Sequence, residues 1–200
     1  MVRLIGSLFV VGILVAVAAS RPAFADDAAA PARSTTGVSL TTSHGVFFGD
    51  DSASQRNGLG VAAYAFQGGS ARFSHLLRVE YTYSWGETLD DFDHFYWSHQ
   101  EHLGRLQLAG RVWWSPRIWS ELAAGAELAR WRTVPVGRMD LQSHGGTELA
   151  SRLDVGVGAE IPTSRAVAVI VDLRAALASF AIIGPPDRAD LVASVGVAWR

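Results

Sequence analysis

The sequence contains no cysteine and no lysine among its 200 residues. Without cysteine, the chain forms neither disulfide bonds nor a lipid anchor on an N-terminal cysteine. All 17 basic residues are therefore arginine, against 19 acidic residues and a formal net charge of -2. This mildly acidic balance gives no indication of a nucleic-acid partner.

The sequence also lacks an apolar segment of helix length downstream of residue 25. The only long apolar run, Leu4 to Ala19, is shorter than the roughly 20 residues that a spanning helix needs. It follows Arg3 and precedes Ala23-Phe24-Ala25, a small-x-small pattern typical of a signal peptide cleavage site. A retained N-terminal anchor is the less favoured alternative.

These features predict three regions. Residues 1–25 are a secretory signal peptide, cleaved after Ala25, and residues 26–36 are a flexible periplasmic leader. Residues 37–200 form one domain. Because 49% of the chain is hydrophobic and no spanning helix remains, this domain needs another way to satisfy its backbone in an apolar setting.

Alternation of apolar and polar side chains is the main signal in this domain. Between Ala71 and Trp85 the odd positions are mostly apolar or aromatic, whereas the even positions include Arg78 and Glu80. Similar alternation occurs at 106–114, 121–131, 149–161, 167–177 and 191–199. Weaker alternation at 37–48 and 58–66 raises the number of predicted strands to eight, with the faces of Tyr64 and Phe66 undecided.

The connections alternate between short and long. Short turns are predicted at 68–70, 115–117 and 162–165, and longer polar loops at 49–57, 86–101, 132–147 and 178–189. This order predicts an all-β fold, a closed antiparallel up-and-down transmembrane β-barrel of eight strands with both termini on the periplasmic side. A further hairpin within a long loop would give ten strands.

Aromatic residues gather near the predicted strand ends. Those expected on the outer side are Phe47, Phe48, Tyr83 and Trp85, and those on the inner side are Phe73, Trp114 and Trp199. We interpret them as two girdles at the membrane interfaces. The general preference of aromatic residues for strands is the alternative explanation.

The polar faces of such a barrel point inward, where an eight-stranded barrel has room only for side chains. Unpaired charges there would be costly, so we expect them to pair. In a hairpin turning at Pro116, Arg111 faces Glu121 and Arg105 faces Glu127, since each pair is symmetric about the turn. Glu80 is expected near Arg105.

A hairpin turning near Thr163 would place Arg152 opposite Arg174 and Asp154 opposite Asp172, so that residues of opposite charge lie on the diagonals of a square. The complete predicted lumen network consists of Arg78, Glu80, Arg105, Arg111, Glu121, Glu127, Arg152, Asp154, Asp172 and Arg174. We interpret it as a plug that replaces a hydrophobic core. The alternative is a narrow ion path gated by switching pairs.

Two groups of residues were weighed as chemical sites. His99, Glu101 and His102 have the residue types of a Zn²⁺ or Cu²⁺ site, although surface contact is the favoured interpretation of this loop. Ser143, His144 and Glu148 supply the types of a serine hydrolase at a spacing that matches no known arrangement. We therefore predict no catalytic residues, no metal and no cofactor.

The chain from about residue 34 to 200 resembles the small outer-membrane β-barrel proteins, which include the OmpA transmembrane domain and the OmpX-like barrels. The segment Ser194 to Trp199 looks like the terminal strand that serves these proteins as an assembly signal, with Arg200 as a departure. The resemblance implies folding by the barrel assembly machinery and location in the bacterial outer membrane. The His-x-Ser segment of the lipid A deacylases is absent.

We therefore expect a non-enzymatic integral outer-membrane protein with a structural role or a surface-interaction role through its outer loops. The expected partners are outer-membrane lipids and lipopolysaccharide, with the loop partner unspecified. The alternatives are a lipid-modifying enzyme, a narrow channel, or a soluble periplasmic barrel with a polar exterior and an apolar lumen.

Overall fold

A computed structural model describes residues 36–48, 53–69, 72–90, 95–137, 141–179 and 187–199. The predicted signal peptide, residues 26–35 of the predicted leader and Arg200 lie outside the described residues. No helix in the described part of the chain is suited to cross a membrane. The strands are β1 (Thr36–Phe48), β2 (Ala53–Gly69), β3 (Phe73–Asp90), β4 (Phe95–Trp113), β5 (Ile118–Val136), β6 (His144–Pro162), β7 (Val167–Ser179) and β8 (Arg188–Trp199).

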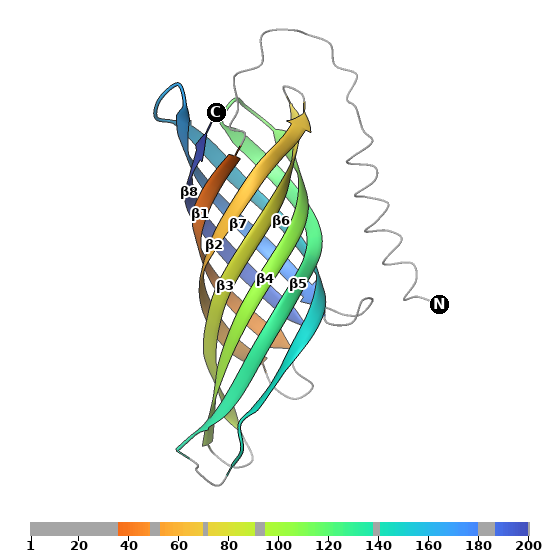
Figure 1. The fold of residues 1–200 in the computed structure, drawn as a ribbon, viewed down its shortest axis with the longest axis vertical. Helices are drawn as coiled ribbons and strands as arrows, with labels where there is room; N and C mark the ends of the chain where they lie inside the picture. The colour runs from red at the N-terminus through yellow and green to blue at the C-terminus, as the bar shows by residue number, and fades with distance from the viewer. Residues whose placement is uncertain are drawn as a thin grey trace, which may run out of the picture.

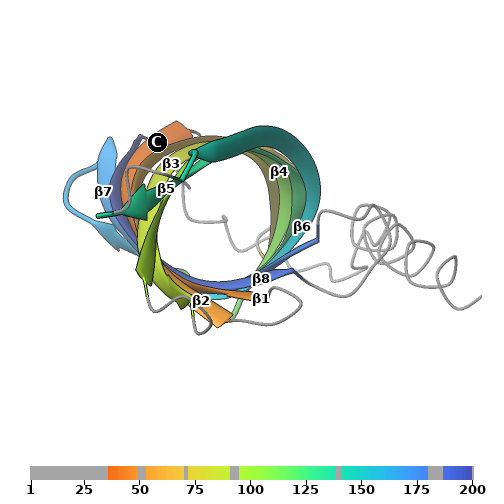
Figure 2. The same ribbon diagram turned by 90° about the horizontal axis from the view of Figure 1, so that it is seen from below.

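The eight strands form a closed barrel in which each is antiparallel to the next. Figure 1 shows the strands tilted against the barrel axis, and Figure 2 shows that they close into a ring. The seam joins β1 to β8, with Thr36 opposite Trp199. The predicted fold, an eight-stranded closed antiparallel β-barrel, is confirmed.

The alternation seen in the sequence divides each strand between the two surfaces of the barrel. On β7, Leu173 and Leu177 point outward, whereas Arg174 and Ala176 are buried inside. The outer surface carries large apolar side chains all around the barrel; Leu40, for example, is 66% exposed. The alternative of a soluble barrel with a polar exterior and an apolar lumen is therefore wrong.

The aromatic residues expected in the girdles divide in the same way where their side chains are described. Trp114 is 73% exposed and Trp199 is 43% exposed, both at the end of the barrel that carries the termini. Trp85 is 39% exposed towards the opposite end. The side chains of Phe47 and Phe48 lie outside the described residues.

Two of the predicted long loops, 86–101 and 132–147, are wrong, because most of their residues belong to strands. β2 begins at Ala53, within the predicted loop 49–57, and most of the predicted loop 178–189 lies outside the described residues. β3 continues to Asp90 and β4 begins at Phe95, so most of the predicted loop 86–101 is a paired hairpin. β5 continues to Val136 and β6 begins at His144, so most of the predicted loop 132–147 also belongs to strands, and the two strands pair as far as Thr133 and His144. Polar side chains on both faces of a segment indicate that water lies on both sides of it. The backbone hydrogen bonds between strands can continue in water, so polar side chains do not by themselves indicate a loop.

The extended parts of β3 to β6 form a rim that projects past β1, β7 and β8 at the lower end of Figure 1. We define the rim as residues 82–90, 95–103, 129–136 and 144–148. The rim begins next to a row of outward positions in which Leu128 pairs with Gly104 on one side and with Leu149 on the other. Here "above" means further towards the rim and away from the short turns.

The register of β4 and β5 agrees with the prediction. Arg105 is opposite Glu127, and Arg111 is opposite Glu121. The strands are joined by a tight turn in which the backbone N–H groups of Arg117 and Ile118 donate to Oγ of Ser115.

The predicted register of β6 and β7 is wrong. Arg174 is opposite Gly156 instead of Arg152, and the two strands meet through a turn centred later than Thr163. The backbone N–H groups of Thr163 and Ser164 both donate to the carbonyl of Val167, each at 3.0 Å. In this register Gly156, which has no side chain, leaves space for the side chain of Arg174.

Gly156→Ala is expected to destabilise the barrel by about 1–3 kcal/mol through overpacking. An added Cβ at Gly156 would lie 2.6 Å from Cγ of Arg174 and 2.9 Å from the carbonyl oxygen of Leu173. The control is Gly104→Ala, because nothing lies within 4 Å of a Cβ at that position. Urea unfolding in phospholipid vesicles measures both, and equal stability of the two variants would contradict the packing described.

Candidate functional site in the barrel interior

The predicted network residues all lie on the inward faces of β3 to β7. Asp172 is half-buried, and the others are buried. Because neighbouring strands place their inward residues side by side, carboxylates and guanidinium groups from different strands lie within contact distance. Their ion pairs divide into three connected parts.

Glu127 on β5 is the first centre of the network. Its carboxylate accepts from Nε of Arg105 at 2.6 Å and from Nη1 of Arg152 at 3.2 Å. It also pairs with Arg188 of β8, which lies across the interior from β5. The Glu127 side chain is completely buried, so its charge is compensated entirely by these arginines.

Glu80 on β3 is the second centre. It pairs with Arg105, as expected from the sequence, and with Arg174 of β7 at 3.0 Å. Arg174 also contacts Asp154 at 3.4 Å and Asp172 at 2.9 Å. The residues expected to form a square with Arg152 are thus connected through Arg174, although in a different register.

The third part lies closer to the short turns. Glu121 pairs with Arg78 and, at 2.7 Å, with Nε of Arg111. The guanidinium carbon of Arg111 also lies 4.2 Å from the ring centroid of Trp119, within the range of a cation–π interaction. Arg111 therefore connects the charged part of the interior to an aromatic part.

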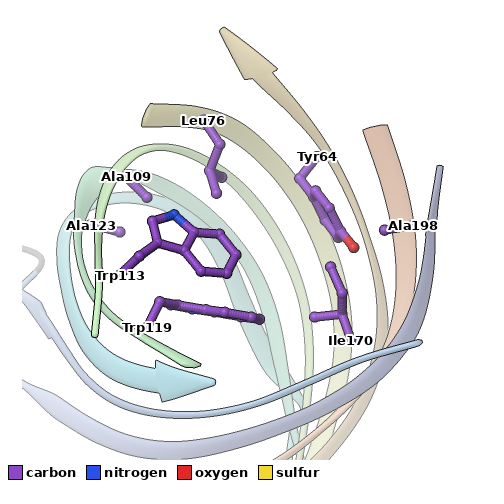
Figure 3. Packing of buried hydrophobic residues seen from close by; sticks show 8 residues of the cluster. All are labelled: Tyr64, Leu76, Ala109, Trp113, Trp119, Ala123, Ile170 and Ala198. Atoms are coloured by element: carbon purple, nitrogen blue, oxygen red, sulfur yellow. The ribbon is translucent and has the colours of Figure 1, made fainter. Parts of the chain in front are cut away.

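That aromatic part, here called the aromatic floor, closes the end of the barrel near the short turns. Figure 3 shows that its side chains point toward one another from several strands. The rings of Trp113 and Trp119 have centroids 5.1 Å apart, and Nε1 of Trp113 donates to Oγ of Ser74. The floor consists of Tyr64, Leu76, Ala109, Trp113, Trp119, Ala123, Ile170 and Ala198.

The structure adds charged residues that the predicted network omitted. Arg56 pairs with Glu101, and Arg188 contacts Asp190 at 3.1 Å and Glu101 at 3.7 Å. Three of these residues, Arg56, Glu101 and Arg188, were omitted because their positions had been assigned to loops. Continuing the period-two alternation outward along β2, β4 and β8 would have placed them inside.

The residues weighed as metal ligands are not brought together. His99 and Glu101 lie on the inner side of β4, whereas His102 is on its outer side, next to the hydroxyl of Tyr81 at 2.7 Å. His99 is hydrogen-bonded to Thr133 at 2.9 Å. Within the described ranges, no cluster of three or more His, Cys, Asp or Glu side chains is arranged to hold a metal.

The residue types of a serine hydrolase are also used differently. Glu148 accepts a hydrogen bond from Nε1 of Trp131 at 3.0 Å. Ser143 and His144 are exposed at the start of β6, where His144 faces the ring of Trp97. Glu148 is therefore engaged in the rim without orienting His144.

No protein-family model matches the sequence, and no curated protein matches it. Solved structures do match. Neisserial surface protein A is 13% identical with a TM-score of 0.54, covering 81% of this chain and 94% of that one. The transport unit of the autotransporter AIDA-I from Escherichia coli is 7% identical with a TM-score of 0.54, covering 94% and 97%.

The shared feature is the fold. At these identities the comparison establishes a closed β-barrel of the kind found in these bacterial proteins. The buried charge network and the aromatic floor are described from this chain's own residues.

Proposed function

We propose that the chain is an integral protein of the bacterial outer membrane whose lumen is plugged by its arginine–carboxylate network and aromatic floor. In this proposal its role is non-enzymatic and is either structural or a surface interaction. The observation that carries it is the inverted arrangement of the barrel, with apolar side chains outside and paired charges inside.

The exterior supports a lipid environment. Side chains such as Leu59, Leu128 and Leu191 are more than half exposed, and exposing so many to water would be unfavourable. A closed barrel also leaves no unpaired strand edge in the hydrocarbon region. The predicted signal peptide and terminal strand support export and insertion by the barrel assembly machinery.

The arrangement of the interior favours a plugged lumen rather than a narrow channel. Arg188 on β8 and Glu127 on β5 meet across the lumen, and the aromatic floor occupies the end near the short turns. The charges are mutually compensated, so moving one arginine to open a path would expose its partners. This arrangement leaves the rim as the part of the protein available for surface interaction.

Planar-bilayer recordings of the refolded mature protein are expected to show no steady conductance. The same recording with Arg105→Ala tests whether the charge network matters for ion flow, since Arg105 contacts both Glu80 and Glu127. Trp114→Ala is the matched control because its ring is 73% exposed on the outer surface. Heat-modified gel mobility establishes that each variant has folded as a barrel.

Steady conductance of the wild type that changes in Arg105→Ala and not in Trp114→Ala would contradict the plug. The charge network would then be the conducting site of a narrow channel. Failure of the wild type to insert into bilayers would contradict the proposal as a whole.

A further inference from the structure

The outer side of the rim carries a group of basic residues, here called the basic patch, formed by His102, Arg130 and Arg132. Arg130 is directly opposite His102 on β4 and Thr147 on β6. Arg132 lies one row higher, opposite Gln100 and Gly145. All three basic side chains are exposed and face away from the lumen.

The strand register places the patch immediately above the apolar surface. The outward row below Arg130 contains Leu128 and Leu149, which are 53% and 61% exposed. In the register, Tyr83 and Arg130 both pair with His102, and Trp85 and Arg132 both pair with Gln100. Because tyrosine and tryptophan prefer the membrane interface, we expect the two neighbouring arginines to lie near the lipid headgroups.

The patch borders a hollow of about 760 Å³. Among the described residues no carboxylate lines it, and Gly145 contributes no side chain beside Arg132. The hollow is lined by Gln100, His102, Arg130, Trp131, Arg132, Ser143, His144, Gly145, Gly146 and Thr147. It is large enough for a headgroup phosphate with its attached sugar.

The arginines of the patch differ from those of the interior in their partners. Arg105, Arg152 and every other described interior arginine make ion pairs with carboxylates. Arg130 and Arg132 make none among the described residues. Among the residues that the structure describes, the nearest outward carboxylate in the register is Glu87, one row further from the apolar surface than Trp85 on β3. The guanidinium groups are therefore available to an external anion.

We propose that the basic patch binds phosphate groups of a lipid headgroup in the outer leaflet, of the kind carried by the lipid A part of lipopolysaccharide. This inference rests on the proposed location in the outer membrane. Guanidinium groups bind phosphate in a bidentate manner, and the leucines below the patch contact the acyl chains of the same lipid. His102 is hydrogen-bonded to the hydroxyl of Tyr81 through Nδ1.

The test uses the mature protein in phosphatidylcholine nanodiscs containing bis-phosphorylated lipid A or its dephosphorylated form. Native mass spectrometry measures the lipid bound to each barrel. The variant is Arg130→Gln combined with Arg132→Gln. The control is Arg117→Gln combined with Arg165→Gln, which removes the same charge from exposed turns at the opposite end.

We expect the wild type and the control to bind phosphorylated lipid A at least about tenfold more tightly than the dephosphorylated form, since one charged hydrogen bond contributes about that much. The Arg130/Arg132 variant is expected to lose this preference. Retention of the preference in that variant, or full competition by millimolar inorganic phosphate, would overturn the inference. Failure of the wild type to enter the discs as a heat-modifiable barrel would instead contradict the proposed function.

Discussion

Glu127→Ala is expected to destabilise the barrel by about 3–5 kcal/mol, because removing one partner of a buried ion pair leaves uncompensated charge. Here the loss affects Arg105, Arg152 and Arg188 together. All three are buried, so water does not replace the missing carboxylate at low cost. Equilibrium urea unfolding of the variant in phospholipid vesicles, followed by tryptophan fluorescence, measures the change.

The control for Glu127→Ala is Glu148→Ala. Glu148 is exposed on the rim and accepts one hydrogen bond, from Trp131. Its loss is expected to change stability by no more than about 1 kcal/mol. Similar free energies of unfolding for the two variants would mean that water reaches the network and that the interior is less compact than described.

Trp119→Ala is expected to have an effect of similar size, about 3–5 kcal/mol, because it creates a large cavity in the aromatic floor. Trp119 has an exposed fraction of 0%, and its ring contacts both Trp113 and the guanidinium of Arg111. The substitution therefore removes packing and a cation–π interaction together. Urea unfolding again gives the magnitude.

Trp114→Ala serves as the control for Trp119→Ala, since the Trp114 ring points outward near the same turn. It is expected to cost clearly less, because removing an outward ring creates no interior cavity. A larger effect from Trp114 than from Trp119 would indicate that anchoring at the interface contributes more to stability than packing of the aromatic floor.

The fold could be predicted from the sequence because alternation with a period of two residues indicates which side chains of a strand face outward and which face inward. Arg78, Glu80 and Asp154 were assigned to the inner face from alternation alone. The pairing of Arg105 with Glu127 followed from the position of one proline turn. These predictions depend on local pattern and on the geometry of a single hairpin.

The errors arose where more than one structure satisfies the local pattern. The turn between β6 and β7 contains several residues that are common in turns, so the sequence does not define its centre. The predicted centre, Thr163, precedes the observed one. Polar residues at 86–101 are compatible with a loop or with a strand in water on both faces.

The candidate site was predicted in part for a related reason. Alternation identifies inward residues but not the partners they reach across the lumen, so the contact of Arg188 with Glu127 was not foreseen. Trp119 shares the inward alternation of Glu121, yet a polar interior was expected throughout. Which inward side chains of different strands meet near the short turns to form the aromatic floor depends on the register of the whole closed barrel.

The bridge between Arg188 on β8 and Glu127 on β5 has a consequence for the order of events during biogenesis. A chain lacking its final strand would expose the Glu127 side of the interior with one of its arginines missing. Neutralisation of Glu127 by Arg188 and closure of the seam between β1 and β8 therefore both require β8. The last strand of the chain thus completes both the backbone ladder of the barrel and the charge balance of its interior.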